Sequence, residues 1–299
     1  MSMRVAVTGS TGLIGEALVA SLRGDGHTVH RLVRGAASAP DEVRWDPMGG
    51  EVDTASLEGV DAVVHLAGEP IGSARWTDDT KRRIHESRSI GTDTLAQALA
   101  AMERPPSVLV SSSGVGVYGA DRGAEVLDET SSVGGDFLAD VCVDWEAATQ
   151  PAADAGIRVV NARTGVVIAE GGPLLDKIEL PFKLGVGGKV LPGTQYVAWI
   201  SLADQIGALR FCIDHEVRGP VNLTAPTPVT NAELTKDLGA VMRRPTVLPI
   251  PAFAIRALYG EMGVTLALSS QRALPSVLLD AGYTFTHTEL REALKVALA

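Results

Sequence analysis

Three glycines near the start of the chain have the spacing expected of residues that hold phosphate. Gly9, Gly12 and Gly15 lie in the segment TGSTGLIG, between an apolar run and an amphipathic one. The first permits a tight turn, the second lets backbone approach a pyrophosphate, and the third lets a helix pack closely on a sheet. The helix would add free N–H groups and a partial positive charge. We expect a dinucleotide-binding turn formed by Gly9, Ser10, Thr11, Gly12, Leu13, Ile14 and Gly15. The alternative is a glycine-rich turn without a ligand.

The segment TVHRLVRG at 28–35 bears on which nicotinamide dinucleotide would bind. In such sites an acidic residue at the end of the second strand binds the ribose hydroxyls of NAD, whereas an arginine binds the 2′-phosphate of NADP. The segment contains no carboxylate, and Arg34 stands at its carboxyl end, where ligands bind. We therefore expect NADP(H) rather than NAD(H), and we interpret Arg31 as a solvated side chain.

Two further segments are expected to border the adenine half of this cofactor. Leu66, Ala67 and Gly68 follow an apolar run, and the small residues at 67 and 68 would let the backbone lie against the adenine ribose and the pyrophosphate. Asp46 ends a shorter run, near where the adenine would lie. We interpret His65 as a packed strand histidine rather than a catalytic group.

Several motifs together resemble the extended short-chain dehydrogenase/reductase superfamily, which includes sugar-nucleotide epimerases and dehydratases. They are TGSTGLIG, VVHLAG, and the serines at 111–113 followed by VYG at 117–119. Other stretches look like its atypical "epimerase family protein" group, whose C-terminal segment is a small domain of unknown function. These stretches are RWDP (44–47), RW (75–76), CVDWE (142–146), RTGVV (163–167), LPFKLGVGGKVLPGTQ (180–195) and GPVNLTAPTPVTN (219–231). The resemblance covers essentially the whole chain.

The resemblance implies a chemistry that this sequence alters. In the superfamily a Tyr-x-x-x-Lys pair supplies the acid or base, with the lysine lowering the tyrosine pKa, and a serine orients the substrate oxygen. Ser113 matches that serine, and Ser111 in the same run is a candidate cofactor contact. None of the four tyrosines is followed four residues later by a lysine. The helix that should carry the pair instead has Cys142 and Glu146, which share one helical face.

This replacement is not conservative. A carboxylate beside a thiol disfavours the thiolate and raises the thiol pKa. Cys142 is therefore expected to be a neutral, poor proton donor, or simply a small buried side chain. Glu146 could act as a general base or accept a hydrogen bond from a ribose hydroxyl. Tyr118 is a candidate substitute acid, with a structural role in the turn after the strand as the alternative.

The segment RTGVV follows the strand after which the superfamily places its nicotinamide. The resemblance thus makes Arg163 and Val166 candidate cofactor contacts, Val166 by packing against the ring. A further group of side chains could line a pocket, with solvated helix charge as the alternative. These are Arg75, Trp76, Lys81 and Arg88.

The elements that must position these residues alternate between strands and helices. Strands are predicted at the apolar runs 4–7, 28–33, 43–45, 61–66, 107–111 and 158–162. Helices are predicted at the periodic segments 13–23, 78–102 and 137–153. Such alternation implies an α/β fold with a Rossmann-type, doubly wound parallel sheet.

The character of the chain changes after residue 172, where prolines and glycines become dense. A helix at 206–213 and a strand at 221–223 are still predicted, and the tail from 231 contains helical stretches between prolines. We predict a dinucleotide-binding domain of residues 1–172, to which 196–224 return. Residues 173–195 and 225–299 are predicted to form a smaller C-terminal lobe that would cap the substrate.

Composition narrows the class of protein. The 299 residues are 45 % apolar, which excludes a disordered class. The 36 acidic and 26 basic residues give a net charge of −10, which argues against nucleic acid or an anionic membrane as partner. No signal peptide and no apolar stretch of the ~20 residues needed for a membrane span is expected. Two isolated cysteines predict neither a disulfide framework nor a metal site, and favour a reducing, cytoplasmic location.

Two functions remain open at this stage. The first is an NADP-dependent oxidoreductase or epimerase-like enzyme acting on a small substrate of unknown identity, which the retained Ser113 and the polar loops of the smaller lobe favour. The second is an NADP(H)-sensing binding protein on an enzyme scaffold that has lost its Tyr and Lys. We favour the enzyme. A monomer and a homodimer formed through the helices at 78–102 and 137–153 are equally open.

Overall fold

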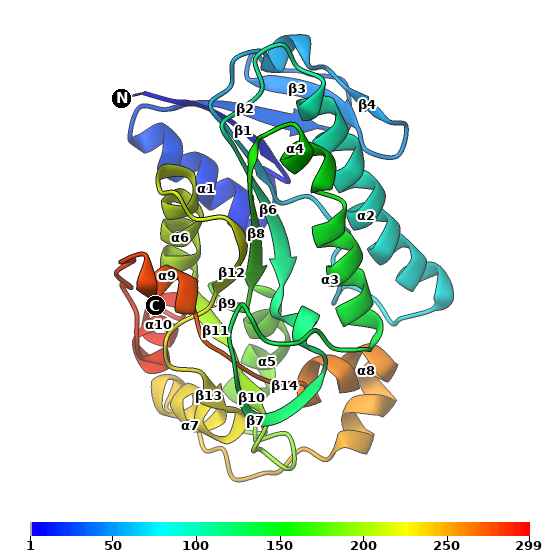
Figure 1. Cartoon of the computed structure of the whole chain (residues 1–299). Helices are drawn as coiled ribbons and strands as arrows, with labels where there is room; N and C mark the ends of the chain where they lie inside the picture. Colours follow the sequence, from blue (N-terminus) through cyan, green and yellow to red (C-terminus); the bar gives the residue numbers. More distant parts are fainter. Residues whose placement is uncertain (1) are drawn as a thin grey trace.

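An eight-stranded sheet dominates the computed structural model, which describes residues 2–299 (Figure 1). The strand order is β12-β8-β6-β5-β1-β2-β3-β4. All neighbours pair in parallel except β3 and β4, which form an antiparallel edge. The strands are β1 (Arg4–Thr8), β2 (Thr28–Val33), β3 (Glu42–Asp46), β4 (Glu51–Val52), β5 (Ala62–His65), β6 (Val108–Gly114), β8 (Arg158–Thr164) and β12 (Gly219–Leu223).

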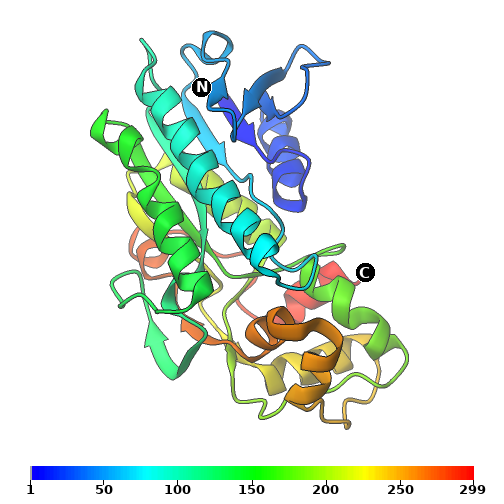
Figure 2. The same cartoon turned by 90° about the vertical axis from the view of Figure 1, so that its right-hand side faces the viewer.

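Helices cover both faces of this sheet, which confirms the predicted Rossmann-type α/β fold. One face carries α1 (Leu13–Gly24) and α6 (Leu202–Asp214), and the other carries α2 (Asp78–Ala100), α3 (Phe137–Ala147) and α4 (Gln150–Asp154) (Figures 1 and 2). Side chains alternate along β1, so Val5 and Val7 join the core under α1 and α6. Ala6 joins the separate core under α2. Both faces of the central strands are therefore buried, as expected for a parallel sheet.

The single helix predicted at 137–153 is wrong, because the chain breaks it into two. Helix α3 ends at Ala147 and α4 begins at Gln150. Pro151 in the first turn of α4 has no N–H, and its ring would clash with the Ala147 carbonyl in a continuous helix. Thr149 donates from Oγ1 to the Glu146 carbonyl at the break, over 2.7 Å. Glu146 thus stands in the last turn of α3.

A smaller helical lobe lies beyond the carboxyl ends of the strands, at the bottom of Figure 1. Its helices are α5 (Pro173–Lys183), α7 (Asn231–Met242), α8 (Ala252–Leu268) and α10 (Leu290–Ala297). Leu175, Phe182 and Leu238 are among its buried core residues. The dense prolines concealed α5 from sequence reasoning, although proline at the start of a helix is favourable. The lobe also has a short antiparallel pair, β10 (Tyr196–Val197) with β13 (Val229–Thr230).

Two small parallel sheets that the sequence did not reveal connect the lobe with the main sheet. In one, β9 (Val166–Ile168) pairs with β11 (Trp199–Ser201). In the other, β7 (Asp121–Leu127) pairs with β14 (Ser270–Ala273). After β14, Leu278 of α9 (Ser276–Asp280) packs into the core under α1 and α6, although it lies in the segment predicted to belong to the lobe. Two 3-10 turns complete the elements, η1 (Ala55–Leu57) and η2 (Val115–Tyr118).

Across residues 2–299, no helix combines the length and the apolar character that crossing a bilayer requires.

Candidate functional site

The three glycines after β1 differ in how much space a side chain would have at each position. A Cβ on Gly15 would lie 2.1 Å from the Gly9 carbonyl oxygen, and one on Gly9, whose φ is +63°, would lie 2.9 Å from the Leu66 carbonyl carbon. A Cβ on Gly12 would have no neighbour closer than 3.5 Å. Packing within the protein therefore requires glycine at 9 and 15, whereas Gly12 keeps an open side where a ligand can approach the backbone.

The start of α1 has backbone N–H groups without a partner in the helix, and they lie next to the open side of Gly12. Gly12 is the N-cap of α1, and no side chain caps the helix. The first N–H groups of a helix have no partner within the helix and carry a partial positive charge. Among the other residues of the turn, Ser10 is buried and Thr11 is exposed. The turn therefore fits a phosphate group of a dinucleotide.

A buried hydrogen-bonded chain ties β1 to the end of β5. Thr8 Oγ1 lies 2.8 Å from His65 Nδ1, and His65 Nε2 lies 3.0 Å from Thr92 Oγ1. His65 is fully buried, and burial lowers its pKa to about 4. It is therefore a packed, neutral histidine, as predicted. Thr8 Oγ1 also accepts from the N–H groups of Leu66 and Ala67, over 3.0 and 3.1 Å, so these amides are not free donors for a cofactor.

The two arginines near the end of β2 have different surroundings. Arg31 pairs with Asp41 and Glu42, with Nε–Oδ2 and Nη2–Oε1 distances of 2.6 and 3.1 Å. Interpreting Arg31 as a solvated side chain was wrong, because the segment leading into β3 brings these carboxylates beside it. Arg34 directly follows β2 and is exposed, and it has no ion pair or hydrogen bond within residues 2–299. Its guanidinium remains available to a ligand.

A buried ion pair occupies the place where the resemblance implied a Tyr–Lys pair. Glu146 accepts two hydrogen bonds from Arg163, Nε to Oε1 and Nη2 to Oε2, both over 2.8 Å. Ser113 donates from Oγ to the same Glu146 Oε1 over 2.7 Å. Burial opposes the charge of Arg163, but the bonds from Glu146 outweigh it and raise the Arg163 pKa. The arginine thus stays charged and balances the carboxylate.

Tyr118 extends this network to Asn222 on β12. Its hydroxyl donates to Asn222 Oδ1 over 2.7 Å and accepts from Arg163 Nη1 over 3.2 Å. Burial raises the Tyr118 pKa, and the side chain is fully buried. The geometry therefore favours a structural role over the predicted role as an acid. Sequence reasoning missed Asn222, although a lone asparagine in the buried strand GPVNL was a signal that it has internal partners.

Cys142 lies beside Ser113 and the turn after β6. Its Sγ is 3.8 Å from the positions that Cβ atoms on Gly114 and Gly116 would occupy. Burial, and after it the charge of Glu146, raises the Cys142 pKa to about 11. Cys142 is therefore a protonated thiol at neutral pH, which agrees with the sequence-based expectation of a poor proton donor.

Three other predicted cofactor contacts are already hydrogen-bonded, buried or packed within the protein. Asp46 Oδ1 accepts from the N–H groups of Met48 and Gly49, which closes the turn between β3 and β4. Ser111 is fully buried within β6. Val166 packs against the core of the smaller lobe. Their contacts with a cofactor remain predictions.

Three of the four pocket candidates, which lie on α2 or just before it, divide into two kinds. Arg75 donates to the Ala257 and Leu258 carbonyls, and Lys81 pairs with Glu261 over 2.7 Å, so both hold α8 against the start of α2. Arg88, by contrast, is buried inside the molecule. The interpretation of solvated helix charge is therefore wrong for Arg88.

No group of three or more His, Cys, Asp or Glu side chains within the described residues 2–299 is arranged to hold a metal ion.

Comparison with known proteins agrees with this geometry. The model of the "NAD dependent epimerase/dehydratase family" matches residues 5–223, and "Domain of unknown function (DUF1731)" matches residues 250–297. Epimerase family protein Mb2239 of Mycobacterium bovis is 46 % identical over 294 residues, covering 98 % of this chain and 97 % of that protein. Epimerase family protein SDR39U1 of Homo sapiens is 34 % identical over 300 residues, covering 99 % and 100 %.

Solved structures extend the similarity to three dimensions. Human epimerase family protein SDR39U1 (isoform 2), crystallised with NADPH, superposes with a TM-score of 0.89 at 34 % identity, covering 99 % of each chain. The nucleoside-diphosphate sugar epimerase of Corynebacterium glutamicum gives 0.82 at 38 % identity, and this chain spans only 58 % of that longer chain. The family match covers most of the chain, and its residues include the glycine turn, Ser113, Cys142, Glu146 and Arg163. The chain therefore belongs to the NAD dependent epimerase/dehydratase family.

Proposed function

We propose that the protein binds NADP(H) across the glycine turn and the end of β2, and that it is an oxidoreductase or epimerase-like enzyme acting on a small substrate. The observation that carries the cofactor assignment is the contrast between Arg31, paired with two carboxylates, and Arg34, exposed and free of protein partners among the described residues. The NADPH in the crystals of the human relative supports the same choice.

In this proposal each part of the cofactor site has a separate task. The open side of Gly12 and the uncapped N–H groups of α1 hold the pyrophosphate. Arg34 binds the 2′-phosphate through charge-assisted hydrogen bonds. The nicotinamide, when bound, supplies or accepts a hydride.

Ser113 is the residue we assign to the substrate oxygen. Its hydroxyl is held by Glu146 at the carboxyl end of β6, so its proton has a defined acceptor. A substrate hydroxyl that donates to Ser113 Oγ would complete a path for a proton toward Glu146, with Arg163 balancing the charge. Cys142 keeps its proton and shapes the site rather than moving protons, since its pKa is about 11.

A second candidate function, NADP(H) sensing without chemistry, is favoured by a different observation. The phenol of Tyr118 is fully buried, and the thiol of Cys142 is held in its neutral form. Neither is therefore an accessible acid of the kind that the wider superfamily uses. A binding protein on this scaffold would need only the glycine turn and Arg34.

Titration with NADPH and NADH tests the cofactor assignment. Arg34→Ala is expected to weaken NADPH binding by about 10- to 100-fold, the effect of losing a charged hydrogen bond, and to leave NADH binding nearly unchanged. Arg31→Ala, three residues earlier on β2, is the matched control and should leave the ratio of the two affinities as it is. Equal losses for both cofactors in Arg34→Ala would contradict the assignment.

Single-turnover oxidation of bound NADPH distinguishes the enzyme from the sensor. The enzyme should oxidise NADPH with at least one member of a panel of small aldehydes, ketones and oxo acids, and Ser113→Ala should slow that step without weakening NADPH binding. Protein that binds NADPH tightly but shows no turnover with the whole panel would favour sensing.

A further inference from the structure

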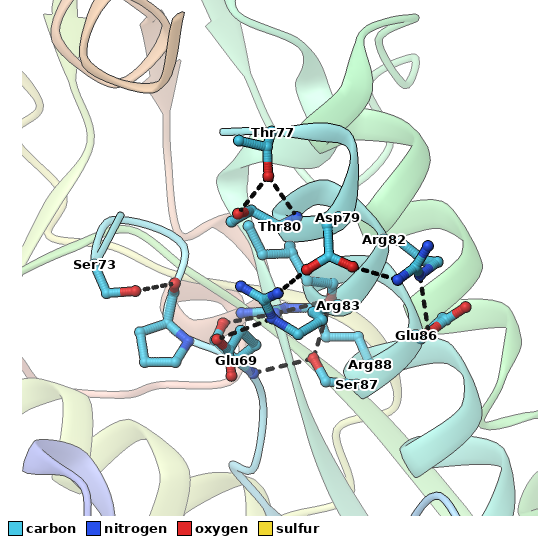
Figure 3. Close-up of polar contacts among 12 residues, drawn as sticks. Glu69, Ser73, Thr77, Asp79, Thr80, Arg82, Arg83, Glu86, Ser87 and Arg88 are labelled. Atoms are coloured by element: carbon cyan, nitrogen blue, oxygen red, sulfur yellow. Dashed lines mark hydrogen bonds and ion pairs between the residues drawn. The ribbon is translucent and has the colours of Figure 1, made fainter. Parts of the chain in front are cut away.

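Two arginines on α2 have the acidic partners expected of surface cations. Arg82 pairs with Asp79 and approaches Glu86, and Arg83 pairs with Asp79 and approaches Glu69 (Figure 3). The side chains of Arg82 and Arg83 are 62 % and 48 % exposed. Their charges are therefore balanced by neighbouring carboxylates and by water.

Arg88, on the same helix, is shielded from water and forms no ion pair within residues 2–299; the charge of Glu69 acts on it only from beyond 4.0 Å. Arg88 is only 6 % exposed. Its Nη1 donates to the Glu69 carbonyl over 2.9 Å (Figure 3). Nη1 also donates to the Ile84 carbonyl over 3.1 Å. No carboxylate oxygen of residues 2–299 lies within 4.0 Å of its guanidinium. Its Nε is buried and has no acceptor in the part of the chain that the structure describes. Burial lowers the Arg88 pKa only to about 10, so the side chain remains a cation at neutral pH.

A buried cation without a counter-ion is strongly unfavourable, so such an arrangement calls for an explanation. The helix itself places Arg88 inward, because residues 84, 88, 91, 95 and 99 follow one face of α2 and four of them are buried beside it. The charge therefore sits inside the protein because of where the residue lies on the helix, not because of a chance side-chain conformation.

The surroundings of Arg88 belong to the candidate site. The guanidinium carbon lies 4.8 Å from the centre of the Trp145 ring. The indole Nε1 of Trp145 is a second buried donor that finds no acceptor among the described residues. Nη2 lies 3.3 Å from where a Cβ on Gly68 would be, so glycine there leaves room for the guanidinium. Trp145 directly precedes Glu146 on α3, and Cys142 stands one turn before it. Arg88 thus lies between the segment after β5 and the helix that carries Cys142 and Glu146.

We propose that Arg88 is the anion receptor of this site, and that it binds the carboxylate or phosphate group of the small molecule that the site takes. The inference rests on the proposed function and adds the substrate class, an anionic carbonyl or hydroxyl compound. A guanidinium binds such groups through two parallel N–H bonds. Within residues 2–299, Arg88 Nε is buried without an acceptor, and the hydrogen bonds of the guanidinium all come from Nη1.

Two sources of the anionic group have to be distinguished, the substrate and the cofactor. The helix start at Gly12 and Arg34 already supply partners for the cofactor phosphates, so we assign Arg88 to the substrate. Under this assignment an Arg88 variant retains NADPH affinity and loses affinity for small anions. Loss of NADPH affinity instead would assign the same receptor to a cofactor phosphate.

The experiment titrates the NADPH-saturated protein with oxalate, acetate and inorganic phosphate, and follows tryptophan fluorescence and calorimetric heat. In the unmodified protein at least one of these anions should bind saturably. Arg88→Met should weaken that binding by tenfold or more, and Arg88→Lys should retain part of it as a single charge. Arg82→Met, which removes a paired arginine from the same helix, is the matched control and should bind as the unmodified protein does.

Each failure has its own signature. If NADPH does not bind to the unmodified protein, the proposed function is wrong. The role of Arg88 is then tested separately, by titrating the cofactor-free protein with the same anions. If NADPH binds but none of the three anions does, or if Arg88→Met binds them as tightly as Arg82→Met, the receptor role is wrong. Circular dichroism establishes that each variant is folded. If Arg88→Met does not fold, Arg88→Lys is the deciding variant. An anion affinity between those of the unmodified protein and no binding supports the receptor role, and an unchanged affinity contradicts it.

Discussion

Ser113 Oγ lies 2.7 Å from Glu146 Oε1, although the two residues stand 33 positions apart in the chain. The same carboxylate accepts two hydrogen bonds from Arg163, one at Oε1, which it shares with Ser113, and one at Oε2. A lysine at position 146 would have presented a positive charge to the site. Here the positive charge belongs to Arg163 on β8, and Glu146 on α3 supplies the hydrogen-bond acceptor. The serine therefore has a proton acceptor in place of the phenol that the wider superfamily uses.

The Glu146–Arg163 pair should contribute strongly to stability. Glu146→Gln removes one charge of a buried pair and leaves Arg163, whose side chain is 6 % exposed, without its counter-ion. We expect the free energy of unfolding in urea to fall by about 3 kcal/mol. Glu125→Gln breaks the pair with Arg122 and removes a carboxylate that is 54 % exposed, so it should have a far smaller effect. Similar decreases in the free energy of unfolding of the two variants would show that the buried pair contributes no more to stability than the pair at Glu125.

Cys142 should titrate at unusually high pH. In a Cys212→Ala background its alkylation by iodoacetamide should rise with pH toward a midpoint near 11, because burial and the charge of Glu146 both disfavour the thiolate. Adding Glu146→Gln removes the negative neighbour and should move the midpoint to lower pH. The midpoint rather than the rate is the readout, since burial also slows the reagent. A midpoint below pH 9 would be incompatible with this environment.

His65 should make the fold sensitive to mild acid. The folded protein holds this histidine neutral, with a pKa of about 4, whereas the unfolded chain takes up the proton near the ordinary value of 6.5. The stabilising contribution is therefore present above 6.5 and is lost as the pH falls toward 4. Between pH 7.5 and pH 5 the loss should be about 2 kcal/mol. Urea denaturation at both pH values measures it, and the difference from His65→Gln isolates this residue. An equally steep decline in His65→Gln would assign the effect to other groups.

Gly12 and Gly15 should respond to the same substitution in opposite ways. Gly15→Ala places a Cβ 2.1 Å from the Gly9 carbonyl oxygen, so it should lower the melting temperature markedly, with a cost of about 3 kcal/mol. Gly12→Ala meets nothing closer than 3.5 Å, so the melting temperature should change little while NADPH affinity falls. Thermal unfolding and NADPH titration on both variants separate the two roles. Intact NADPH binding in Gly12→Ala would mean that the open side is not the phosphate site.

Much of the fold could be predicted because its signals are local. Strand β2 occupies 28–33, as its apolar run predicted, and α1 begins at Leu13 and ends within one residue of its predicted end. Alternating strand and helix periods imply parallel pairing, since a helix must return the chain to the same end of the sheet. The glycine turn was equally local, because its three positions and the strand before it are contiguous. Pairing of β7 with β14 joins segments nearly 150 residues apart, and no local pattern reports it.

The sequence by itself determined the sheet, the glycine turn, the lack of a carboxylate at the end of β2 and the loss of the Tyr–Lys pair. Only the tertiary structure decided which charges are compensated. Arg163 lies on a strand and Glu146 on a helix of another layer, so their pairing depends on how the layers pack. The structure likewise paired Arg31, and within residues 2–299 it gave Arg34 no partner and buried Arg88 without an ion pair. Charges interact through space over a few ångströms, and the order of residues along the chain does not specify those distances.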